Sequence, residues 1–164
     1  MNIPAHTVRS DYASPLGRMI LAAVDDRLLG VWFDEQAHLP DLSNCASDPR
    51  HPVLQRTAKQ LTQYFAGQRR SFDVLLATVA GTAFQQAVWR ALRDIPFGST
   101  CSYGELAARI GKPAAVRAVG AAVGRNPLSV IVPCHRVIGA SGSLTGYAGG
   151  LQRKTALLQL EGAL

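Results

Sequence analysis

The spacing of apolar residues in the first part of the chain predicts a β-hairpin. Short apolar stretches at residues 19–24 and 28–33 flank the polar triplet Asp25-Asp26-Arg27. Two such stretches separated by a few turn-forming residues are typical of paired antiparallel strands. Ser14-Pro15-Leu16-Gly17 is a second turn signal just before the first stretch.

A helical pattern follows a polar loop at residues 37–52. Residues 53–65 carry apolar side chains on one side of a predicted helix, which Gly67 would end. Residues 72–76 are apolar enough for one more strand. We therefore expect an α/β domain with a small antiparallel sheet over residues 1–76. The apolar positions of its predicted helix are Leu54, Ala58, Leu61 and Phe65.

The second part of the chain has mostly helical spacing. We expect residues 77–83 to connect the domains and residues 84–164 to form a mainly α domain. The first of its helices has Val88, Trp89 and Leu92 as core candidates. The predicted elements are helices at 84–92, 103–110, 114–123 and 151–160, a short strand at 129–132, and a glycine-rich loop at 139–150.

Two of these helices form a candidate helix-turn-helix at residues 102–124. Ser102 is a good N-cap, and Glu105 three residues later completes a capping box. Gly111-Lys112-Pro113 breaks the chain between the helices, and proline suits a first helical turn. The pattern fits both a DNA-binding motif and an ordinary helical hairpin.

The second helix of this pair combines small residues with spaced arginines. Arg117, Ala121 and Arg125 fall on one stripe at intervals of four residues. A helix of small residues can approach a nucleic-acid groove closely, and the same smallness suits tight packing between helices. The sequence leaves both readings open.

The net charge of +6 is confined to the second half of the chain. Lys and Arg equal Asp and Glu in residues 1–80, eight each, whereas residues 81–164 carry nine basic and three acidic residues. Nucleic acid is therefore the first partner to consider for the second domain, because basic groups neutralise phosphates and release counterions.

The cysteines and the apolar segments exclude other classes of protein. Cys45, Cys101 and Cys134 are odd in number and widely spaced, which argues against a disulfide framework. Neither a Cys-x-x-Cys pair nor a histidine cluster supports a zinc site, so we expect no metal. The start of the chain has no signal-peptide pattern, and no apolar run is long enough to span a bilayer. We expect a cytoplasmic protein without membrane contact.

Residues 126–139, NPLSVIVPCHRVIG, carry the most informative chemistry. Cys134 follows an apolar stretch and Pro133, and His135 and Arg136 come next. A thiolate is the reactive form of cysteine, and a nearby base or positive charge favours it. Taken singly, each residue has an ordinary structural reading: a buried thiol, a buried histidine and an Asn-Pro turn at Asn126. Together and in this order they indicate a nucleophilic site.

This run resembles the active-site signature Pro-Cys-His-Arg-Val of the O6-alkylguanine-DNA alkyltransferases. The resemblance extends over about residues 82–162, and the first half looks like the more variable N-terminal α/β lobe of that family. It implies that Cys134 accepts an alkyl group from damaged guanine. It also implies that His135 acts as a base through water, that Glu161 orients His135, and that Asn126 holds the active-site turn together.

The resemblance also implies contacts with DNA and with the damaged base. Tyr103 would contact the base and the flanking phosphate, and Arg117 would fill the gap left by a base turned out of the helix. Tyr147 and the Gly149-Gly150 loop would wall the pocket, and Lys154 would polarise the leaving guanine. The predicted DNA-contacting set is completed by Ala118, Ala121, Arg125 and Arg136.

The partner implied is double-stranded DNA carrying O6-alkylguanine, bound through its minor groove, which suits the small residues of the second helix. A thioether at Cys134 resists water, so each molecule would react once, without metal or cofactor. We expect a monomer. The sequence leaves open whether the protein assembles cooperatively on DNA and whether it reacts with O4-alkylthymine. The alkyl size it accepts is also open, because Ala148 replaces a serine found in some relatives.

Three other functions compete with this one. A relative that only recognises alkylated DNA would lack the reactive cysteine, whereas Cys134 is present. A plain helix-turn-helix regulator would have no use for the Pro-Cys-His-Arg run. A thiol hydrolase would need an oxyanion hole, for which the sequence shows no pattern.

Overall fold

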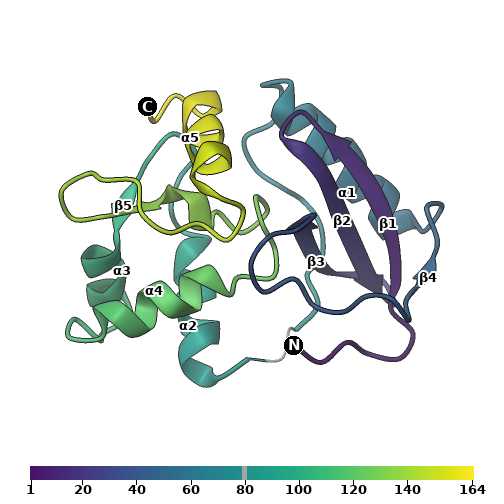
Figure 1. The fold of residues 1–164 in the computed structure, drawn as a ribbon, viewed down its shortest axis with the longest axis horizontal. Coiled ribbons are helices and arrows are strands. Elements are labelled where there is room, and N and C mark those ends of the chain that lie inside the picture. Colours follow the sequence, from purple (N-terminus) through teal and green to yellow (C-terminus); the bar gives the residue numbers. More distant parts are fainter. Residues whose placement is uncertain (79–80) are drawn as a thin grey trace. The chain divides into compact units, whose positions relative to one another are not determined.

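The computed structural model describes residues 1–78 and 81–164, which form two compact units (Figure 1). The first unit contains residues 1–78 and the later segment Pro127–Ile131, and the second contains residues 81–126 and 132–164. The predicted division into two consecutive domains, joined at residues 77–83, does not include the return of segment Pro127–Ile131 to the first unit. Part of that predicted connection, residues 79–80, lies outside the described residues.

The first unit is built on a four-stranded sheet in the order β3-β2-β1-β4. The predicted hairpin is present, and Asp25 makes its turn with φ 52°. The first strand was not predicted, because its sequence VRSDYAS is mostly polar and half-exposed. The strands are β1 (Val8–Ser14), β2 (Gly17–Val24), β3 (Arg27–Phe33) and β4 (Ala46–Ser47), with β4 parallel to β1 and the other pairs antiparallel.

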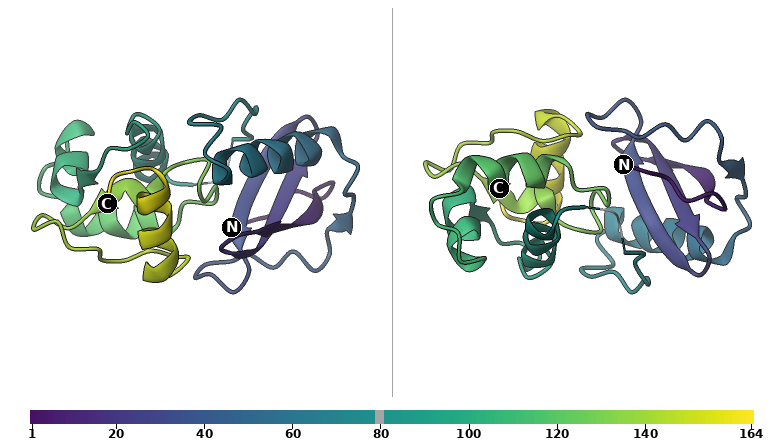
Figure 2. Two further views of the ribbon diagram at one scale, coloured as in Figure 1. Left: turned by 90° about the horizontal axis from the view of Figure 1, so that it is seen from above. Right: turned by 90° about the horizontal axis from the view of Figure 1, so that it is seen from below.

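Helix α1 (Pro52–Phe65) packs along one face of the sheet, as Figure 2 shows. The helix begins where predicted, but its buried stripe is rotated by about one position. Thr57 and Tyr64 are buried beside Leu54 and Leu61, in place of the predicted Ala58 and Phe65. The ring of Tyr64 fills this interface by packing against Phe65 and Phe72. Leu42 and Trp32 belong to a second apolar cluster with Ile20, Ala22 and Leu29.

Two chain segments cover the free edge of β3. The amide of Leu28 donates to the carbonyl of Leu75, and the amide of Val31 donates to the carbonyl of Pro127. Each contact is a single parallel bridge, so the strands predicted at 72–76 and 129–132 are wrong. The segment at 127–131 is mostly buried, whereas Leu75 in the other is 57% exposed, and both turn away before a regular ladder forms. An edge strand covered in this way is protected from pairing with other chains.

The second unit is mainly helical, as predicted. Its two-stranded parallel sheet pairs Cys101 with Val137 and Ser102 with Ile138. Val88, Trp89 and Leu92 are buried as expected. No helix in the described ranges is long and apolar enough to cross a membrane. The elements are α2 (Ala83–Leu92), β5 (Cys101–Ser102), α3 (Tyr103–Arg109), α4 (Val116–Gly124), the 3-10 helix η1 (Cys134–Arg136), β6 (Val137–Ile138) and α5 (Leu151–Leu160).

Helices α3 and α4 form the predicted helix pair. Ser102 caps α3: its hydroxyl accepts from the amide of Glu105, and the Glu105 carboxylate accepts from the amide of Ser102. Helix α4 begins at Val116, two residues later than predicted, and Pro113 lies before it in a turn closed by Ala115 and Lys112. Helix α2 packs against α4, and Trp89 Nε1 donates a hydrogen bond to the carbonyl of Ala122.

We expect Ser102→Ala to lower the free energy of unfolding by about 1 kcal/mol, because an amide at the start of α3 loses its acceptor. Urea denaturation measures this loss. Ser141→Ala is the matched control, since the Ser141 hydroxyl is exposed and bonds only Ser143 at 3.3 Å. A loss for Ser102→Ala no larger than for the control would contradict the capping role.

Candidate functional site

Cys134 begins the 3-10 helix η1 at the end of a tightly turned segment. Its amide donates to the carbonyl of Val132 at 2.8 Å across Pro133, which has φ −82° and ψ 64°. The same carbonyl accepts a hydrogen bond from Asn126 Nδ2 at 2.9 Å. Two donors therefore hold the carbonyl of Val132, and with it the backbone just before Cys134. The side chain of Asn126 thereby closes the turn formed by residues 126–132.

The thiol of Cys134 is almost fully buried, with 5% of the residue exposed. Burial raises the pKa of the thiol above its usual range, because a thiolate is poorly solvated there. A hydrogen bond from Asn126 lowers this pKa, and the charge of Lys154 acts in the same direction. The thiol therefore resembles neither an exposed cysteine nor an inert core cysteine, since groups placed next to it favour its charged form.

His135 and Glu161 form a buried hydrogen bond of 2.7 Å between Nε2 and Oε2. Burial lowers the pKa of His135, while the Glu161 carboxylate raises it. A carboxylate can only accept, so Nε2 carries the proton and Nδ1 keeps a lone pair. Nδ1 is buried and has no hydrogen-bond partner in the described part of the chain. The imidazole is thus oriented as a base with its accepting nitrogen free.

Glu161 also holds Arg136 in a two-point ion pair, with Nε to Oε1 at 2.7 Å and Nη2 to Oε2 at 3.0 Å. Arg136 Nη1 donates to the carbonyl of Ile95, and the guanidinium lies 5.7 Å from the centre of the Phe97 ring. Arg136 is 7% exposed. These three donors of Arg136 are turned inward to Glu161 and to the carbonyl of Ile95 within the unit, so its contact with DNA stays a prediction that the burial does not favour.

Lys154 and Tyr103 hold the glycine-rich loop beside the cysteine. Lys154 Nζ is buried and donates to the carbonyls of Val137, Thr145 and Gly146. The Tyr103 hydroxyl donates to the carbonyl of Thr145 at 2.9 Å. Lys154 Nζ lies 5.9 Å from the centre of the Tyr103 ring. Both side chains therefore meet at the same stretch of loop backbone.

Both of these groups have shifted ionisation. Burial lowers the pKa of Lys154 to about 8, and the neighbouring Cys134 thiolate opposes that shift. Burial also raises the pKa of Tyr103, as does the charge of Cys134. Tyr103 therefore remains a protonated donor at neutral pH, and Lys154 is mostly charged but close to its titration range.

The predicted DNA-contacting residues of α4 lie on its outer side. Arg117, Ala118 and Ala121 are exposed, and so is Arg125, which caps the helix end. Val119, Ala122 and Val123 point into the unit. Helix α4 thus has two faces. One packs in the core, and the other exposes arginines between small side chains and is open to a partner.

The loop residues of the predicted pocket differ in exposure. Gly149 is buried, Tyr147 is half-buried, and Gly150 has φ 91° where the loop enters α5. Thr145 and Ile95 take part through their carbonyls, which sequence analysis did not find because any residue type supplies a carbonyl. Phe97, which packs on Arg136, had no distinguishing motif either.

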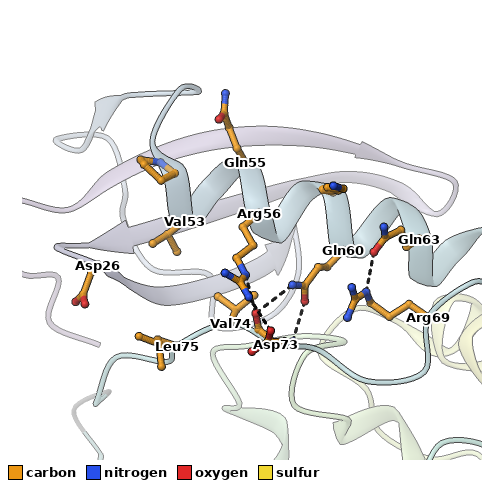
Figure 3. A pocket seen from close by; sticks show the side chains of 12 residues that line it. Asp26, Val53, Gln55, Arg56, Gln60, Gln63, Arg69, Asp73, Val74 and Leu75 are labelled. Carbon is orange, nitrogen blue, oxygen red and sulfur yellow. Dashed lines mark hydrogen bonds and ion pairs between the residues drawn. The ribbon is translucent and has the colours of Figure 1, made fainter.

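A separate cavity lies on the first unit, between α1 and the segment before the domain connection (Figure 3). Arg56 and Gln60 reach from the helix to Asp73, and Arg69 bonds Gln63. None of the predicted site residues lines it. Arg56 and Arg69 already have partners there, and the lining residues all come from the first unit, so this cavity is distinct from the cysteine site.

The fold and the site define a class of protein: a helix-turn-helix domain that holds a buried cysteine next to a histidine–glutamate pair. Two family models match the chain. The DNA-binding domain of 6-O-methylguanine DNA methyltransferase matches residues 83–163, and the ribonuclease-like domain of the same family matches residues 8–78.

Relatives and solved structures agree with these models. Methylated-DNA–protein-cysteine methyltransferase of Mycobacterium bovis is 51% identical over 148 residues, 90% of this chain and 88% of the relative. The one of Methanosarcina acetivorans is 48% identical over 155 residues, 93% and 96% of the two chains. The crystal structure of Mycobacterium tuberculosis O6-methylguanine methyltransferase has a TM-score of 0.88 at 48% identity, with 96% and 93% of the chains covered. A structure of the M. tuberculosis protein in complex with DNA has a TM-score of 0.87 at 49% identity, with the same coverage.

The chain belongs to the 6-O-methylguanine DNA methyltransferase family. It is accordingly a DNA-binding methyltransferase of DNA repair, which transfers an alkyl group from DNA to a cysteine of its own.

We expect Arg136→Gln to lower the free energy of unfolding by about 3 kcal/mol, because the buried Glu161 carboxylate loses its two-point cationic partner. The salt dependence of DNA binding should not change, since the charge lies inside the unit. Arg125→Ala, at an exposed arginine, is the control and should do the reverse. Urea denaturation and salt titration of DNA affinity separate the two. A shallower salt dependence for Arg136→Gln at unchanged stability would support the predicted DNA contact.

Proposed function

We propose that the chain removes the alkyl group of O6-alkylguanine in double-stranded DNA by transferring it irreversibly to Cys134. The observation that carries this assignment is the arrangement of Cys134, Asn126 and the His135–Glu161 pair in one unit. Cys45 and Cys101 are also free thiols, but neither has a histidine beside it in the sequence. Burial raises the pKa of both.

The reaction begins with removal of the thiol proton. The free Nδ1 of His135 takes that proton through one bridging water, and Glu161 stabilises the imidazolium that forms. Asn126 and Lys154 lower the pKa of Cys134 and so favour the thiolate. The surrounding low dielectric strengthens each of these interactions.

The thiolate then displaces guanine from the alkyl carbon. A bond forms between Sγ and the alkyl carbon, the bond from that carbon to O6 breaks, and its electron pair stays on guanine. The guanine anion takes up one proton as it leaves. The positive charge of Lys154 near Cys134 would stabilise that anion, and Tyr103 would donate to it by turning its hydroxyl away from the carbonyl of Thr145. Water does not readily cleave the resulting thioether, so each molecule reacts once.

The lesion must leave the base stack to reach a buried thiol, at a cost of a few kcal/mol. Arg117 is exposed near the start of α4 and supplies a long planar cation to stack in the gap. Ala118 and Ala121 on the same outer side let the helix backbone come close to DNA. We infer binding through the minor groove, because a helix with such small exposed side chains suits that narrow groove.

One chain contains the whole set of groups used here, so we propose that the protein acts as a monomer. We place it in the cytoplasm, because a nucleophilic thiol must stay reduced and that compartment keeps thiols reduced.

We expect Cys134 to gain a single methyl group when the protein is mixed with DNA carrying O6-methylguanine. Intact-mass spectrometry should show one added methylene per chain and a plateau at equimolar lesion, because the thioether is stable. Peptide mapping should place it on Cys134.

The control variants are Cys134→Ser, which should not react, and Cys101→Ser, which should react like the wild type. Repeated turnover, or a mass gain that survives Cys134→Ser, would overturn the proposed function.

We expect Arg117→Ala to slow repair in duplex DNA by about tenfold or more, because the extruded state loses its stacking partner. Reaction with free O6-methylguanine base should be nearly unchanged, since no base has to be flipped. Single-turnover rates on the two substrates measure the difference. Arg109→Ala, at another exposed arginine of the helix pair, is the control. Equal losses on duplex and free base would remove the role of Arg117 in base flipping.

A further inference from the structure

The segment between Asn126 and Val132 belongs to the first unit, although both flanking residues belong to the second. The amide of Val31 donates to the carbonyl of Pro127, and the amide of Ser129 donates to the carbonyl of Val31, each at 2.9 Å. The last residues of β3 therefore hold the chain just before the active-site turn. The chain then continues directly into Val132, whose carbonyl accepts from Asn126 and Cys134.

Val130, within this segment, has an unfavourable backbone conformation. Its φ is 71°, and the amide of Ile131 donates to the carbonyl of Ser129 at 2.9 Å, which closes a three-residue turn. A β-branched residue rarely adopts positive φ, and this kind of turn is strained. Such a conformation persists only where the surroundings determine it. Val130 is 1% exposed, so its side chain is fixed by packing as well.

Gln36 supplies a polar anchor for the same segment. Its side-chain oxygen accepts from the amide of Phe33 at 2.7 Å and from the hydroxyl of Ser129 at 3.1 Å. Gln36 and Ser129 are both buried, with 7% and 2% exposed. One oxygen thus ties the end of β3 to the residue before the strained turn, across 93 positions of sequence.

We propose that Gln36 is a positioning residue for Cys134: through Ser129 it keeps the turn at Val130 in its strained form, and that turn fixes Asn126 and Val132 for their hydrogen bond. Every contact in this chain of effects lies within one unit, and the step from one unit to the other is the covalent backbone from Ile131 to Val132. The inference rests on the proposed function only in taking Cys134 as the acceptor.

The consequence reaches the thiol through Asn126. When the turn relaxes, Asn126 loses its place beside Val132 and no longer stabilises the thiolate. The other groups that influence Cys134 come from different elements: Lys154 from α5, Tyr103 from α3, and His135 with its partner Glu161. The hydrogen bonds of Gln36 go to Phe33, Ala37 and Ser129, all within the first unit. A change in thiol reactivity caused at Gln36 therefore reports on the turn.

The test compares Gln36→Met with Gln60→Met. Gln60 is also a buried glutamine of the first unit, with hydrogen bonds to the backbone of Asp73 through both ends of its amide. Methionine keeps the length of either side chain and removes its hydrogen bonds, so the variants match in burial and in stability cost.

The first measurement is the single-turnover rate of methyl transfer from O6-methylguanine DNA. The second is the pH dependence of Cys134 alkylation by iodoacetamide, read by peptide mapping, which needs neither DNA nor alkyl transfer from guanine. Gln36→Met should slow transfer by about tenfold, the factor that corresponds to one ordinary hydrogen bond. It should also move the midpoint of the alkylation profile to higher pH. Gln60→Met should leave both unchanged.

A second variant isolates the strain. Glycine adopts positive φ freely, so Val130→Gly in the Gln36→Met background should recover most of the lost rate. A folded double variant that stays slow would overturn the role of the turn. Wild-type behaviour of Gln36→Met, or equal impairment by Gln60→Met, would overturn the role of Gln36. If the wild type took no methyl group from DNA, the proposed function would fail, and the iodoacetamide profiles would still decide this inference.

Discussion

The buried carboxylate of Glu161 organises the reactive end of the molecule. It accepts one hydrogen bond from Nε2 of His135 and two from nitrogens of Arg136. The two from Arg136 join opposite charges. Removing such a charge from water is costly unless its partners are well placed. The partners are themselves held in place, because Arg136 also bonds the carbonyl of Ile95. This network ties α5, η1 and the loop after α2 together and leaves His135 with its accepting nitrogen free.

The cysteine site depends on a balance between burial and compensation. A sealed thiol excludes water from the transfer step, but the same burial raises the pKa of Cys134. Asn126 and Lys154 oppose that effect, and backbone carbonyls fix both: that of Val132 for Asn126, and those of Val137 in β6 and of Thr145 and Gly146 in the loop for Lys154. Backbone carbonyls around the site thus position the two groups that favour the thiolate.

The helix pair illustrates how far a pattern leads. The capping box at Ser102, the break at Gly111 and the spacing of Arg117 and Arg125 were sufficient to place both helices and their arginines. The composition of α4 does not indicate which of its sides faces solvent, since alanines and glycines occur all around the helix. Packing of Val119 and Val123 into the unit decides it, and the arginines are left on the opposite, exposed side.

The sequence by itself determined the helical second domain and the hairpin of the first, and it singled out Cys134 and its two neighbours as the proposed site, because these follow from local order and periodicity. At Arg136, adjacency to Cys134 gave no information on where the guanidinium points, and the structure turns it toward Glu161. It also predicted strands at 72–76 and 129–132, because a short apolar stretch looks alike in a strand and in a single bridge. The pairing of Glu161 with His135 was expected only from the family resemblance, and the contact of Gln36 with Ser129 came from the tertiary structure alone. Contacts between residues so distant in sequence depend on how the whole chain packs, and no local pattern encodes them.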